Sequence, residues 1–513
     1  MKDKKRKDKK WLVELLNRRA IIAVLIILQF AFLSYLVLSS SLLSEGLSVF
    51  FSLMSVLVAL HIISQRGRSA YKLSWLFLVL AFPILGGFLY LFFNFQGSRR
   101  IASKHSKRIE FKTAEFFELS KPEFNAAVQN FPEHSKQISY PQNFAGFPIY
   151  DATKTRYLSP GEEFLAVLLE ELEKAKEYIF LEFFIVQEGE MFDSVLEVLK
   201  RKAKEGVKVR ILYDDIGCFL LLPKDYVKTL KGFGIEAAVF NPFMPVLSAV
   251  QNNRDHRKIV SIDGRVAFTG GINLADEYIN AFEKHGYWKD SAIMLSGKGA
   301  WSLTLIFLQN WELVTGAGDD IAAFFPDFCD QTDGFVQPYA DSPLDSEPVS
   351  QEVYMQMIHD AKRYLYIMTP YLIIDENMVS ALILSAKSGV DVKIITPKVW
   401  DKKAVHMTTR SYYPELISGG VKIYEFTPGF IHSKIMIVDG EVASIGTVNL
   451  DFRSLYLHFE CGVKLYGSSA VTAMTEDFLA TLKKCEEISA KGIKGGFFRR
   501  IGRDILRLFA PLM

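Results

Sequence analysis

The sequence predicts an α/β protein in which two duplicated α/β units follow a set of N-terminal transmembrane helices. Three observations support this fold class. A motif of eighteen residues occurs twice, at 256–273 and 432–449, with the same spacing. Helix-like and strand-like segments alternate in the same order around both copies. Long apolar runs almost free of charge lie before residue 97. A repeat of this kind indicates an internal duplication.

The N-terminal region, residues 1–96, contains three apolar runs at 21–43, 47–64 and 73–95. Each is close to the roughly twenty residues that a helix needs to cross hydrocarbon, so we expect two to three transmembrane helices and a multi-pass membrane protein. Basic residues near the N-terminus place that end in the cytoplasm. Basic residues after the third run favour the cytoplasmic side for the rest of the chain, and Pro83 could break that run, so the orientation stays open.

The remainder of the chain divides into a connector and two units with the same order of elements. The connector, 97–152, has little periodicity. In the first unit, 153–330, we expect helices at 160–177 and 191–205 and strands at 178–186 and 207–213. In the second unit, 331–490, we expect helices at 350–363 and 377–388 and strands at 364–369 and 390–395. Each unit should therefore contain a mixed sheet with helices on its faces.

The two motif copies place the same polar residues at the same intervals. They are His256, Lys258, Asp263, Gly270 and Asn273 in the first copy, and His432, Lys434, Asp439, Gly446 and Asn449 in the second. An apolar run follows each lysine and ends at Asp-Gly, which is a strong hairpin signal. Residues two apart on a strand face the same side, so each histidine should share a space with its lysine.

Two imidazoles and two ammonium groups suit chemistry at a phosphodiester. The lysines can neutralise the nonbridging oxygens while negative charge develops. One histidine can attack phosphorus and the other can protonate the leaving oxygen. We interpret the other seven histidines, His458 among them, as packed or surface residues, because a lone histidine is more often that than a catalyst.

The complete pattern H-x-K-x4-D-x6-G-x2-N in both copies resembles the HKD motif of the phospholipase D superfamily. The flanking residues 253–258, 270–278, 288–290 and 446–454 are most similar to those of bacterial cardiolipin synthases. This resemblance implies two phospholipase D-like units that meet across a pseudo-two-fold axis in one catalytic body, in a bacterial cell membrane. It also implies phosphatidyl transfer between two phosphatidylglycerols through a phosphohistidine. We take His256 as the nucleophile and His432 as the acid, and the reverse assignment stays open.

The resemblance implies no cofactor, no metal and no nucleotide, because the four cationic or protonatable groups take the role of a metal. The sequence contains no GK[ST] loop and no C-x-x-C pair. It has no arginine-rich patch for nucleic acid outside the membrane-proximal regions. A membrane-bound phospholipase D-type hydrolase, a phosphatidyl transferase with another donor or acceptor, and a lipid-binding scaffold remain as alternatives, and the oligomeric state stays open.

Two acids outside the motif are candidates for supporting residues. Asp290 and Glu460 follow the two motifs at similar intervals, each at the start of an apolar run. A catalytic histidine needs an acceptor at its second ring nitrogen, and we hypothesise that each acid serves one histidine. The alternative is that both are solvated charges at strand edges.

The motif aspartates and asparagines complete the predicted site. Asp263 and Asp439 belong to the motif that the resemblance treats as catalytic, but their place beside turn glycines favours bracing the hairpin or the lysine. Asn273 and Asn449 can donate a hydrogen bond to a phosphate oxygen, and the resemblance places them near the site.

The C-terminal segment, 491–513, predicts a basic amphipathic helix. Bulky residues recur at helical spacing from Phe498 to Leu512, with arginines mostly on the other side. Such a helix suits the surface of an anionic membrane, which favours phosphatidylglycerol as substrate and anionic membrane lipid as partner. The alternative is a terminal helix docked on the enzyme itself.

Overall fold

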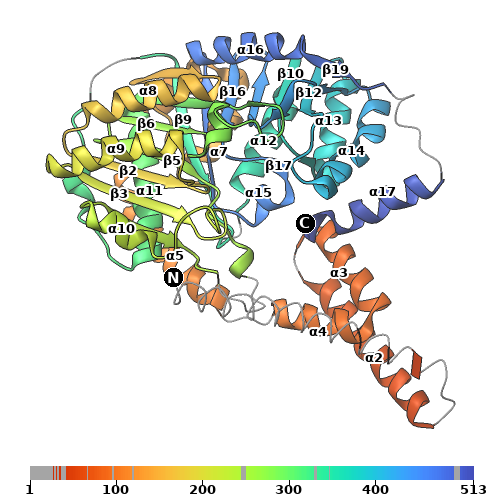
Figure 1. Cartoon of the computed structure of the whole chain (residues 1–513). Coiled ribbons are helices and arrows are strands. Elements are labelled where there is room, and N and C mark those ends of the chain that lie inside the picture. Colours follow the sequence, from red (N-terminus) through yellow and green to blue (C-terminus); the bar gives the residue numbers. More distant parts are fainter. Residues whose placement is uncertain are drawn as a thin grey trace. The chain divides into compact units, whose positions relative to one another are not determined.

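The computed structural model describes residues 27, 31, 34–35, 42–65, 67–94, 98–117, 121–243, 250–328, 332–345, 347–489 and 497–512. These residues form two compact units (Figure 1). One, here called the helical unit, contains the described residues up to Ile101 together with 243, 250–252 and 507–512. The other, here called the α/β body, comprises Ala102–Pro242 and Asn253–Leu506 and contains both motifs.

The helical unit is built on three packed helices: α2 (Leu42–Ser64), α3 (Ser69–Ala81) and α4 (Pro83–Asn94). Val58, Ile62, Trp75, Val79 and Tyr90 form its small buried core. Within the described residues one helical segment, Glu45–Ser64 in α2, is long and apolar enough to cross a membrane. This segment matches the second predicted span, 47–64, extended by two residues at its start.

The third predicted span, 73–95, is not a single helix, so the expectation of several transmembrane helices is not confirmed. The helix stops at Phe82, whose φ of −132° and ψ of 75° are not helical, and α4 begins at Pro83. Proline is well suited to a first helical position and poorly suited to an interior one. A Cβ on Gly86 would lie 2.3 Å from the carbonyl oxygen of Leu78, so the backbones approach closely at this break. The first predicted span, 21–43, lies almost wholly outside the described residues.

The connector contains short helices: α5 (Ser98–Thr113), α6 (Lys121–Asn130) and α7 (Ser135–Asn143). The C-terminal segment is also helical, with α17 spanning Phe497–Phe509 and a short 3-10 turn at Ala510–Leu512. Its last residues belong to the helical unit, where Leu512 packs on the core around Trp75. The end of the segment is thus packed, while Ile501 and Ile505 are exposed.

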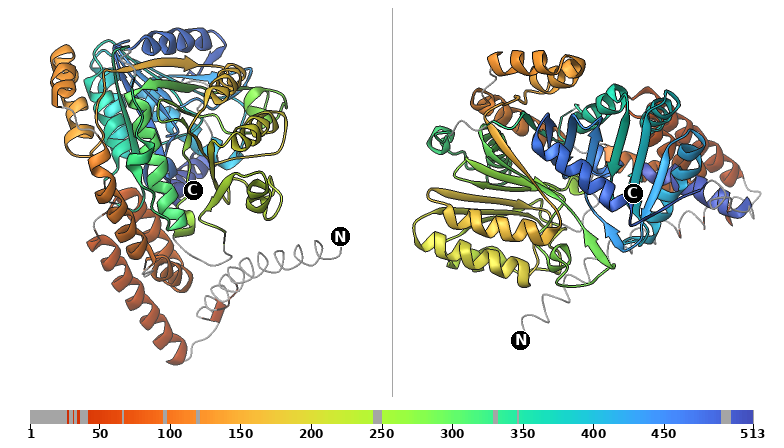
Figure 2. Two further views of the ribbon diagram at one scale, coloured as in Figure 1. Left: turned by 90° about the vertical axis from the view of Figure 1, so that its left-hand side faces the viewer. Right: turned by 90° about the horizontal axis from the view of Figure 1, so that it is seen from above.

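The first sheet of the α/β body has the strand order β1-β8-β6-β5-β2-β3-β4. Its strands are β1 (Thr153–Leu158), β2 (Tyr178–Phe183), β3 (Lys208–Asp214), β4 (Glu236–Phe240), β5 (Lys258–Ile262), β6 (Val266–Gly270) and β8 (Ala292–Gly297). The strands β2, β3 and β4 are parallel and the other pairs are antiparallel, so the sheet is mixed as predicted. Helices α8 (Gly161–Lys174) and α9 (Glu190–Lys204), drawn in yellow in Figure 2, share a buried core with it.

The second sheet has the strand order β9-β18-β16-β15-β10-β12-β13-β19. The strands from β9 to β13 repeat the order of the first sheet, and β19 is added beside β13. Its strands are β9 (Phe335–Asp341), β10 (Tyr364–Met368), β12 (Asp391–Pro397), β13 (Lys422–Phe426), β15 (Ile435–Val438), β16 (Val442–Gly446), β18 (Glu460–Tyr466) and β19 (Cys485–Glu487). Its helices include α12 (Val349–Asp360), α13 (Glu376–Lys387), α14 (Lys403–Ser418) and α16 (Ser469–Leu482). The duplication predicted from the motif therefore extends over the whole α/β unit.

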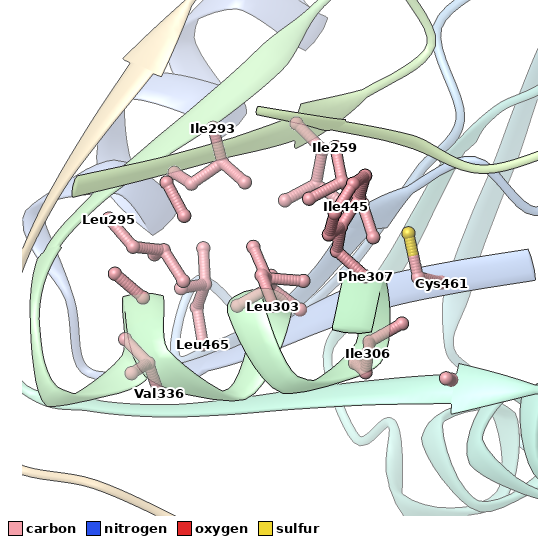
Figure 3. Packing of buried hydrophobic residues seen from close by; sticks show 14 of the residues in the cluster. Ile259, Ile293, Leu295, Leu303, Ile306, Phe307, Val336, Ile445, Cys461 and Leu465 are labelled. Carbon is pink, nitrogen blue, oxygen red and sulfur yellow. The ribbon is translucent and has the colours of Figure 1, made fainter. Parts of the chain in front are cut away.

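One hydrophobic core joins the two sheets. The helix α11 (Lys298–Thr315) contributes Leu303, Ile306 and Phe307, which pack with residues of both sheets (Figure 3). The partners labelled there are Ile259, Ile293 and Leu295 of the first sheet and Val336, Ile445, Cys461 and Leu465 of the second. Because this core is shared, the two sheets form one body whose halves hold each other in place.

Candidate active site

Each motif forms the predicted hairpin. The strands β5 and β6 are joined at Asp263 and Gly264, with φ of 50° and 63°, and β15 and β16 are joined at Asp439 and Gly440, with φ of 55° and 73°. Two consecutive residues with positive φ give the tight turn that matches the twist of paired strands. Lys258 lies opposite Phe183 in the register, so the segment around His256 lies at the carboxyl end of β2.

The backbone of each motif histidine is bound to the other half of the α/β body. The amide of His256 donates to the carbonyl oxygen of Phe459 at 2.9 Å, and the amide of His432 donates to that of Lys289 at 2.7 Å. Phe459 and Lys289 come directly before Glu460 and Asp290. The main chain therefore places each histidine beside the acid of the opposite half.

The side chains complete these crosswise pairs. The Nδ1 atom of His256 lies 2.9 Å from Oε1 of Glu460, and the Nδ1 atom of His432 lies 2.6 Å from Oδ2 of Asp290. Both carboxylates are fully buried, which excludes the alternative that they are solvated charges. A carboxylate at Nδ1 orients the ring and leaves Nε2 for chemistry.

The motif lysines lie in the same buried space. The Nζ atom of Lys258 donates to the carbonyl oxygen of His256 at 2.6 Å, and Lys434 makes the same bond to His432. Burial lowers the pKa of Lys258 to about 8 and that of Lys434 to about 7. The two ammonium groups are thus charged below neutral pH and are easily neutralised above it.

The charges of the site act on one another across the two halves. Burial, followed by the charge of Lys258, lowers the pKa of His256 well below its usual range, and Lys434 and His432 add to this shift. Burial and Lys434 lower the pKa of His432 to about 4. Both imidazoles are therefore neutral at pH 7 in the free protein.

The two carboxylates differ in their protonation behaviour. Burial alone would raise the pKa of Asp290, but the adjacent His432 and Lys434 lower it below its usual range. Burial raises the pKa of Glu460, in spite of the charge of Lys258. The hydroxyl of Thr447 also donates to Glu460, whereas the equivalent position beside Asp290 is Gly271.

The motif aspartates brace the hairpins through backbone hydrogen bonds. The carboxylate of Asp263 accepts three backbone N–H groups, from residues 176 to 178, at 2.8 Å each. Asp439 accepts the three equivalent groups at the start of β10, between 2.7 and 2.9 Å. These bonds fix the turn of each hairpin to the start of the neighbouring strand, β2 or β10.

The two motif asparagines have different surroundings. The side-chain oxygen of Asn273 accepts from the amide of Ile185 at 3.0 Å, and its nitrogen donates to the hydroxyl of Tyr278 at 2.6 Å. Asn273 therefore supports the local chain. The side-chain oxygen of Asn449 is buried and has no hydrogen-bond partner among the residues that the structure describes.

His458 was missed by sequence reasoning. Its ring centre lies 5.7 Å from that of His256, and its Nδ1 lies 4.0 Å from Glu460. Both of its ring nitrogens are buried without a hydrogen-bond partner in the described part of the chain. The available signal was its position two residues before Glu460, since alternate residues of an extended segment face the same side. At the equivalent position of the other half, Trp288 packs on His432 with ring centres 5.3 Å apart.

One group of side chains has the composition of a metal site. Within the described ranges, His256, His458 and Glu460 bring three potential ligand atoms within 4.8 Å of one another. The ammonium group of Lys258 acts on the same residues and opposes a divalent cation there. The arrangement fits phosphate chemistry better, because two lysines and two histidines provide positive charge and proton transfer for an anionic phosphodiester.

Comparison with known proteins agrees with this geometry. A family model described as cardiolipin synthase, PLD-like domain, matches residues 168–286 and 354–482, and a phospholipase D-nuclease N-terminal model matches 53–93. A cardiolipin synthase of Geobacillus sp. (strain WCH70) is 37% identical over 506 residues, covering 96% of this chain and 99% of that protein. Cardiolipin synthase 2 of Bacillus anthracis is 35% identical over 477 residues, covering 90% and 91%.

A solved structure supports the fold. The crystal structure of phosphatidylserine synthase from Haemophilus influenzae Rd KW20 aligns with a TM-score of 0.55, covering 74% of this chain and 98% of that one, at 17% identity. The duplicated sheets, the two complete motifs and the extent of the match to the bacterial synthases lead to one conclusion. The chain belongs to the cardiolipin synthase family of the phospholipase D superfamily.

Proposed function

We propose that this chain is a phosphatidyltransferase that joins two phosphatidylglycerol molecules into cardiolipin and releases glycerol. The observation that carries the proposal is the pair of buried histidines, each held at Nδ1 by a carboxylate of the other half and each accompanied by a lysine. The names of its relatives support the substrate class. Phosphatidyl transfer needs no energy source, because one phosphodiester bond replaces another.

In the first step, Nε2 of His256 attacks phosphorus of one phosphatidylglycerol. The bond from phosphorus to the glycerol oxygen breaks, and His432 gives that oxygen a proton. His432 is neutral in the free protein, and the bound anionic phosphodiester favours its protonated form. Lys258 and Lys434 offset the negative charge that develops on the nonbridging oxygens.

In the second step, the primary hydroxyl of another phosphatidylglycerol attacks the phosphatidyl group on His256. The now neutral His432 accepts the hydroxyl proton, the bond from His256 to phosphorus breaks, and cardiolipin leaves. Both steps use the same groups in opposite directions, so the reaction is reversible and added glycerol opposes it. We propose that Asn449, whose side-chain oxygen lacks the backbone partner that Asn273 has, donates through its side-chain nitrogen to a phosphate oxygen.

The membrane part of the proposal rests on the helical unit. The segment Glu45–Ser64 anchors the chain, and a multi-pass arrangement in a bacterial cell membrane results if the apolar run at 21–43 also crosses. The arginines of α17 suit an anionic leaflet.

The decisive experiment uses the full chain in vesicles with phosphatidylglycerol as the sole reactive lipid, in chelator and without nucleotide. We expect cardiolipin and glycerol in equal amounts, and neither product from the His256→Ala or the His432→Ala variant. Phosphatidic acid in place of cardiolipin would instead make the chain a hydrolase. If product forms only after phosphatidylethanolamine or a further alcohol is added, the added compound is the donor or acceptor in place of one phosphatidylglycerol.

A further inference from the structure

Two segments of the α/β body, the loop after β3 and the loop and first turns of α14 after β12, present large apolar side chains to solvent. Ile216 and Leu220 follow β3 and are 39% and 78% exposed, while Trp400 and Met407 follow β12 and are 49% and 48% exposed. We call these four residues the apolar rim. Single exposed apolar residues are common on protein surfaces, so the position of these four decides whether they matter.

The register of the first sheet places its loop at the same edge as His256. Phe183, the last residue of β2, pairs with Tyr213 near the end of β3 and with Lys258 at the start of β5. The chain leaving β3 and the chain entering β5 therefore meet at one edge. The carboxylate of Asp214 joins them, because it accepts from the amides of Ile216 at 2.9 Å and Asp255 at 3.0 Å.

The second sheet repeats this placement around His432. Met368, the last residue of β10, pairs with Ile395 of β12 and with Ile435 of β15. The loop after β12, which carries Trp400, thus leaves the sheet at the edge where His432 enters it. Because β3 and β12 hold equivalent positions in the two sheets, the apolar rim comes from the segments that follow equivalent strands of the duplication, and Met407 lies in the first turns of α14.

Leu220 is held outward at a conformational cost. Its φ of 66° lies in the left-handed region, which non-glycine residues rarely adopt, yet its side chain is the most exposed of the four. Strained residues cluster at functional sites, where the strain is maintained because the residue has a use. The positive φ and the exposure of Leu220 together make it a candidate for contact with an apolar surface outside the α/β body.

We propose that the apolar rim enters the outer part of a lipid bilayer and holds the edge with the two histidines against the phospholipid headgroups. The proposal rests on the proposed function for the identity of the lipid. Both substrates keep their acyl chains in the bilayer while their phosphorus atoms must reach buried side chains, so the edge has to approach the surface closely.

Charge favours an anionic bilayer as the occupant. Of the charged side chains in residues 215–225 and 398–407, four lysines and one aspartate are exposed, and Asp215 and Asp401 are half-buried. The lysines are Lys224, Lys398, Lys402 and Lys403, and the aspartate is Asp225. Lys398 forms an ion pair with Glu486, so the other three lysines carry the excess positive charge. Basic residues beside exposed apolar ones are typical of surfaces that bind anionic leaflets.

Trp400 gives a direct readout of this contact. The full chain is reconstituted in phosphatidylglycerol-containing vesicles with or without brominated acyl chains, and the tryptophan emission of a Trp400→Phe variant is subtracted. We expect the Trp400 emission to be quenched by the bromine atoms and protected from aqueous iodide. Quenching by iodide alone would overturn the proposal. Protection from both quenchers would also overturn it, because the helical unit or a second copy would then cover the rim.

Activity gives a second, independent test through Leu220. The Leu220→Gly variant removes the side chain and places glycine at a position with positive φ. The substitution should therefore stabilise the fold, whereas it should weaken binding to the membrane. We expect about a tenfold loss of cardiolipin formation on vesicles. With short-chain phosphatidylglycerol below its micelle concentration we expect a much smaller loss. Unchanged activity on vesicles would contradict the proposal.

A matched control separates the apolar rim from exposed apolar residues in general. Leu384 is 62% exposed and lies near the end of α13. This helix leads into the start of β12, so Leu384 is at the edge of the sheet opposite to the apolar rim. The Leu384→Gln variant should keep its activity on both forms of the lipid. Failure of the proposed function would look different, since the unaltered chain would make no cardiolipin from either form while the quenching of Trp400 could still occur.

Discussion

Each motif histidine takes its orienting carboxylate from the other half of the α/β body. The geometry is reciprocal, with Glu460 at Nδ1 of His256 and Asp290 at Nδ1 of His432. A neutral imidazole that donates its Nδ1 proton to a carboxylate presents a lone pair at Nε2. In the proposed mechanism the carboxylates therefore set which ring nitrogen meets the phosphodiester.

Replacing one of these acids by its amide tests this role. We expect Glu460→Gln and Asp290→Asn each to lower kcat by about 10²–10⁴, because an amide no longer selects the required tautomer or stabilises a protonated ring. The KM for phosphatidylglycerol should change little. Steady-state kinetics with short-chain lipid measures both quantities, and an altered KM with unchanged kcat would assign the acids to binding.

The order of the two histidines is a separate prediction. If His256 is the nucleophile, a His432→Ala variant should accumulate a phosphatidyl-enzyme with radiolabelled phosphatidylglycerol, because transfer to the protein precedes a slow release. The His256→Ala variant should accumulate none. Denatured protein is then tested for its label, since a phosphohistidine keeps the label in alkali and releases it in acid. Label found only in the His256→Ala variant would make His432 the nucleophile and His256 the acid.

The motif aspartates should affect stability and not chemistry. Removing the carboxylate in Asp263→Ala leaves three backbone N–H groups without their acceptor. We expect a loss of about 3 kcal/mol in the free energy of unfolding, with kcat per folded molecule unchanged. Chemical denaturation and active-site titration measure the two effects. A normal unfolding curve with abolished turnover would restore Asp263 to the catalytic residues.

The lysines predict how activity depends on pH. Since Lys434 and Lys258 have pKa values of about 7 and about 8, their positive charge is present at lower pH and lost as pH rises through this interval. The kcat/KM for phosphatidyl transfer should therefore fall from about pH 7 to pH 9, because this quantity reports groups of the free enzyme. A profile that is flat over this interval would show that transfer does not need these charges.

At the level of helices and strands, local patterns predicted much of the α/β body. The strands expected at 178–186, 207–213, 364–369 and 390–395 correspond to β2, β3, β10 and β12, with ends that differ by a few residues. The Asp-Gly pairs form the expected turns, because only residues that tolerate positive φ suit them. Periodicity and turn chemistry are local properties, so one sequence is enough to show them.

Features that depend on distant contacts were not predictable in this way. The similar intervals from the motifs to Asp290 and Glu460 suggested one acid for each histidine, but not that the pairs cross between halves. That crossing depends on backbone bonds between segments far apart in the sequence, such as His256 and Phe459. The place of His458 beside His256 depends on the same bonds, and its sequence pattern resembles that of any strand residue.

The strand β18 carries a buried charge whose effect on folding can be measured. Lys464 is fully buried, donates to the carbonyl oxygen of Gln137 at 3.1 Å, and has a pKa lowered by burial to about 7. In the unfolded chain a lysine titrates near 10.5, so between these values the unfolded state binds more protons and stability rises with pH.

Removing this charge should therefore stabilise the protein most at low pH. We expect Lys464→Met to gain roughly 2–4 kcal/mol over the unaltered chain below pH 7, and to lose that advantage as pH approaches 10. Denaturant titrations of both proteins across this range measure the difference. An advantage that is constant with pH would show that Lys464 titrates normally in the folded state.

At the scale of the whole molecule, the site exists because the duplication shares one core. Residues of both sheets pack on α11, and each histidine is bound through its backbone and its ring to the opposite half. Neither half contains a complete histidine and carboxylate pair. Separation of the two sheets by even a small shift would break both pairs together, so stability and activity of the α/β body should be lost in one transition.

The C-terminal segment packs on α3 in the helical unit, and this contact gives a final prediction. The hydroxyl of Ser74 donates to the carbonyl oxygen of Leu508 at 2.5 Å, the rings of Phe77 and Phe509 lie 5.6 Å apart, and Leu512 packs against the core of α2 to α4. Deleting residues 508–513 removes all three contacts. We expect a lower midpoint for the thermal unfolding of the helical unit, because its small core has few other contacts to replace them.

The same deletion should spare the chemistry, since the core of the α/β body contains none of these residues. Cardiolipin formation from short-chain phosphatidylglycerol should remain near that of the full chain at temperatures below the lowered midpoint. Ile505→Gln serves as the matched control, because Ile505 is 50% exposed and its replacement removes an apolar residue of α17 without touching the packed end. Equal unfolding midpoints for the deletion and this control would show that the C-terminal contact does not stabilise the helical unit. A deletion that lowers the midpoint and also abolishes turnover on the short-chain lipid would show that the helical unit supports the active site itself.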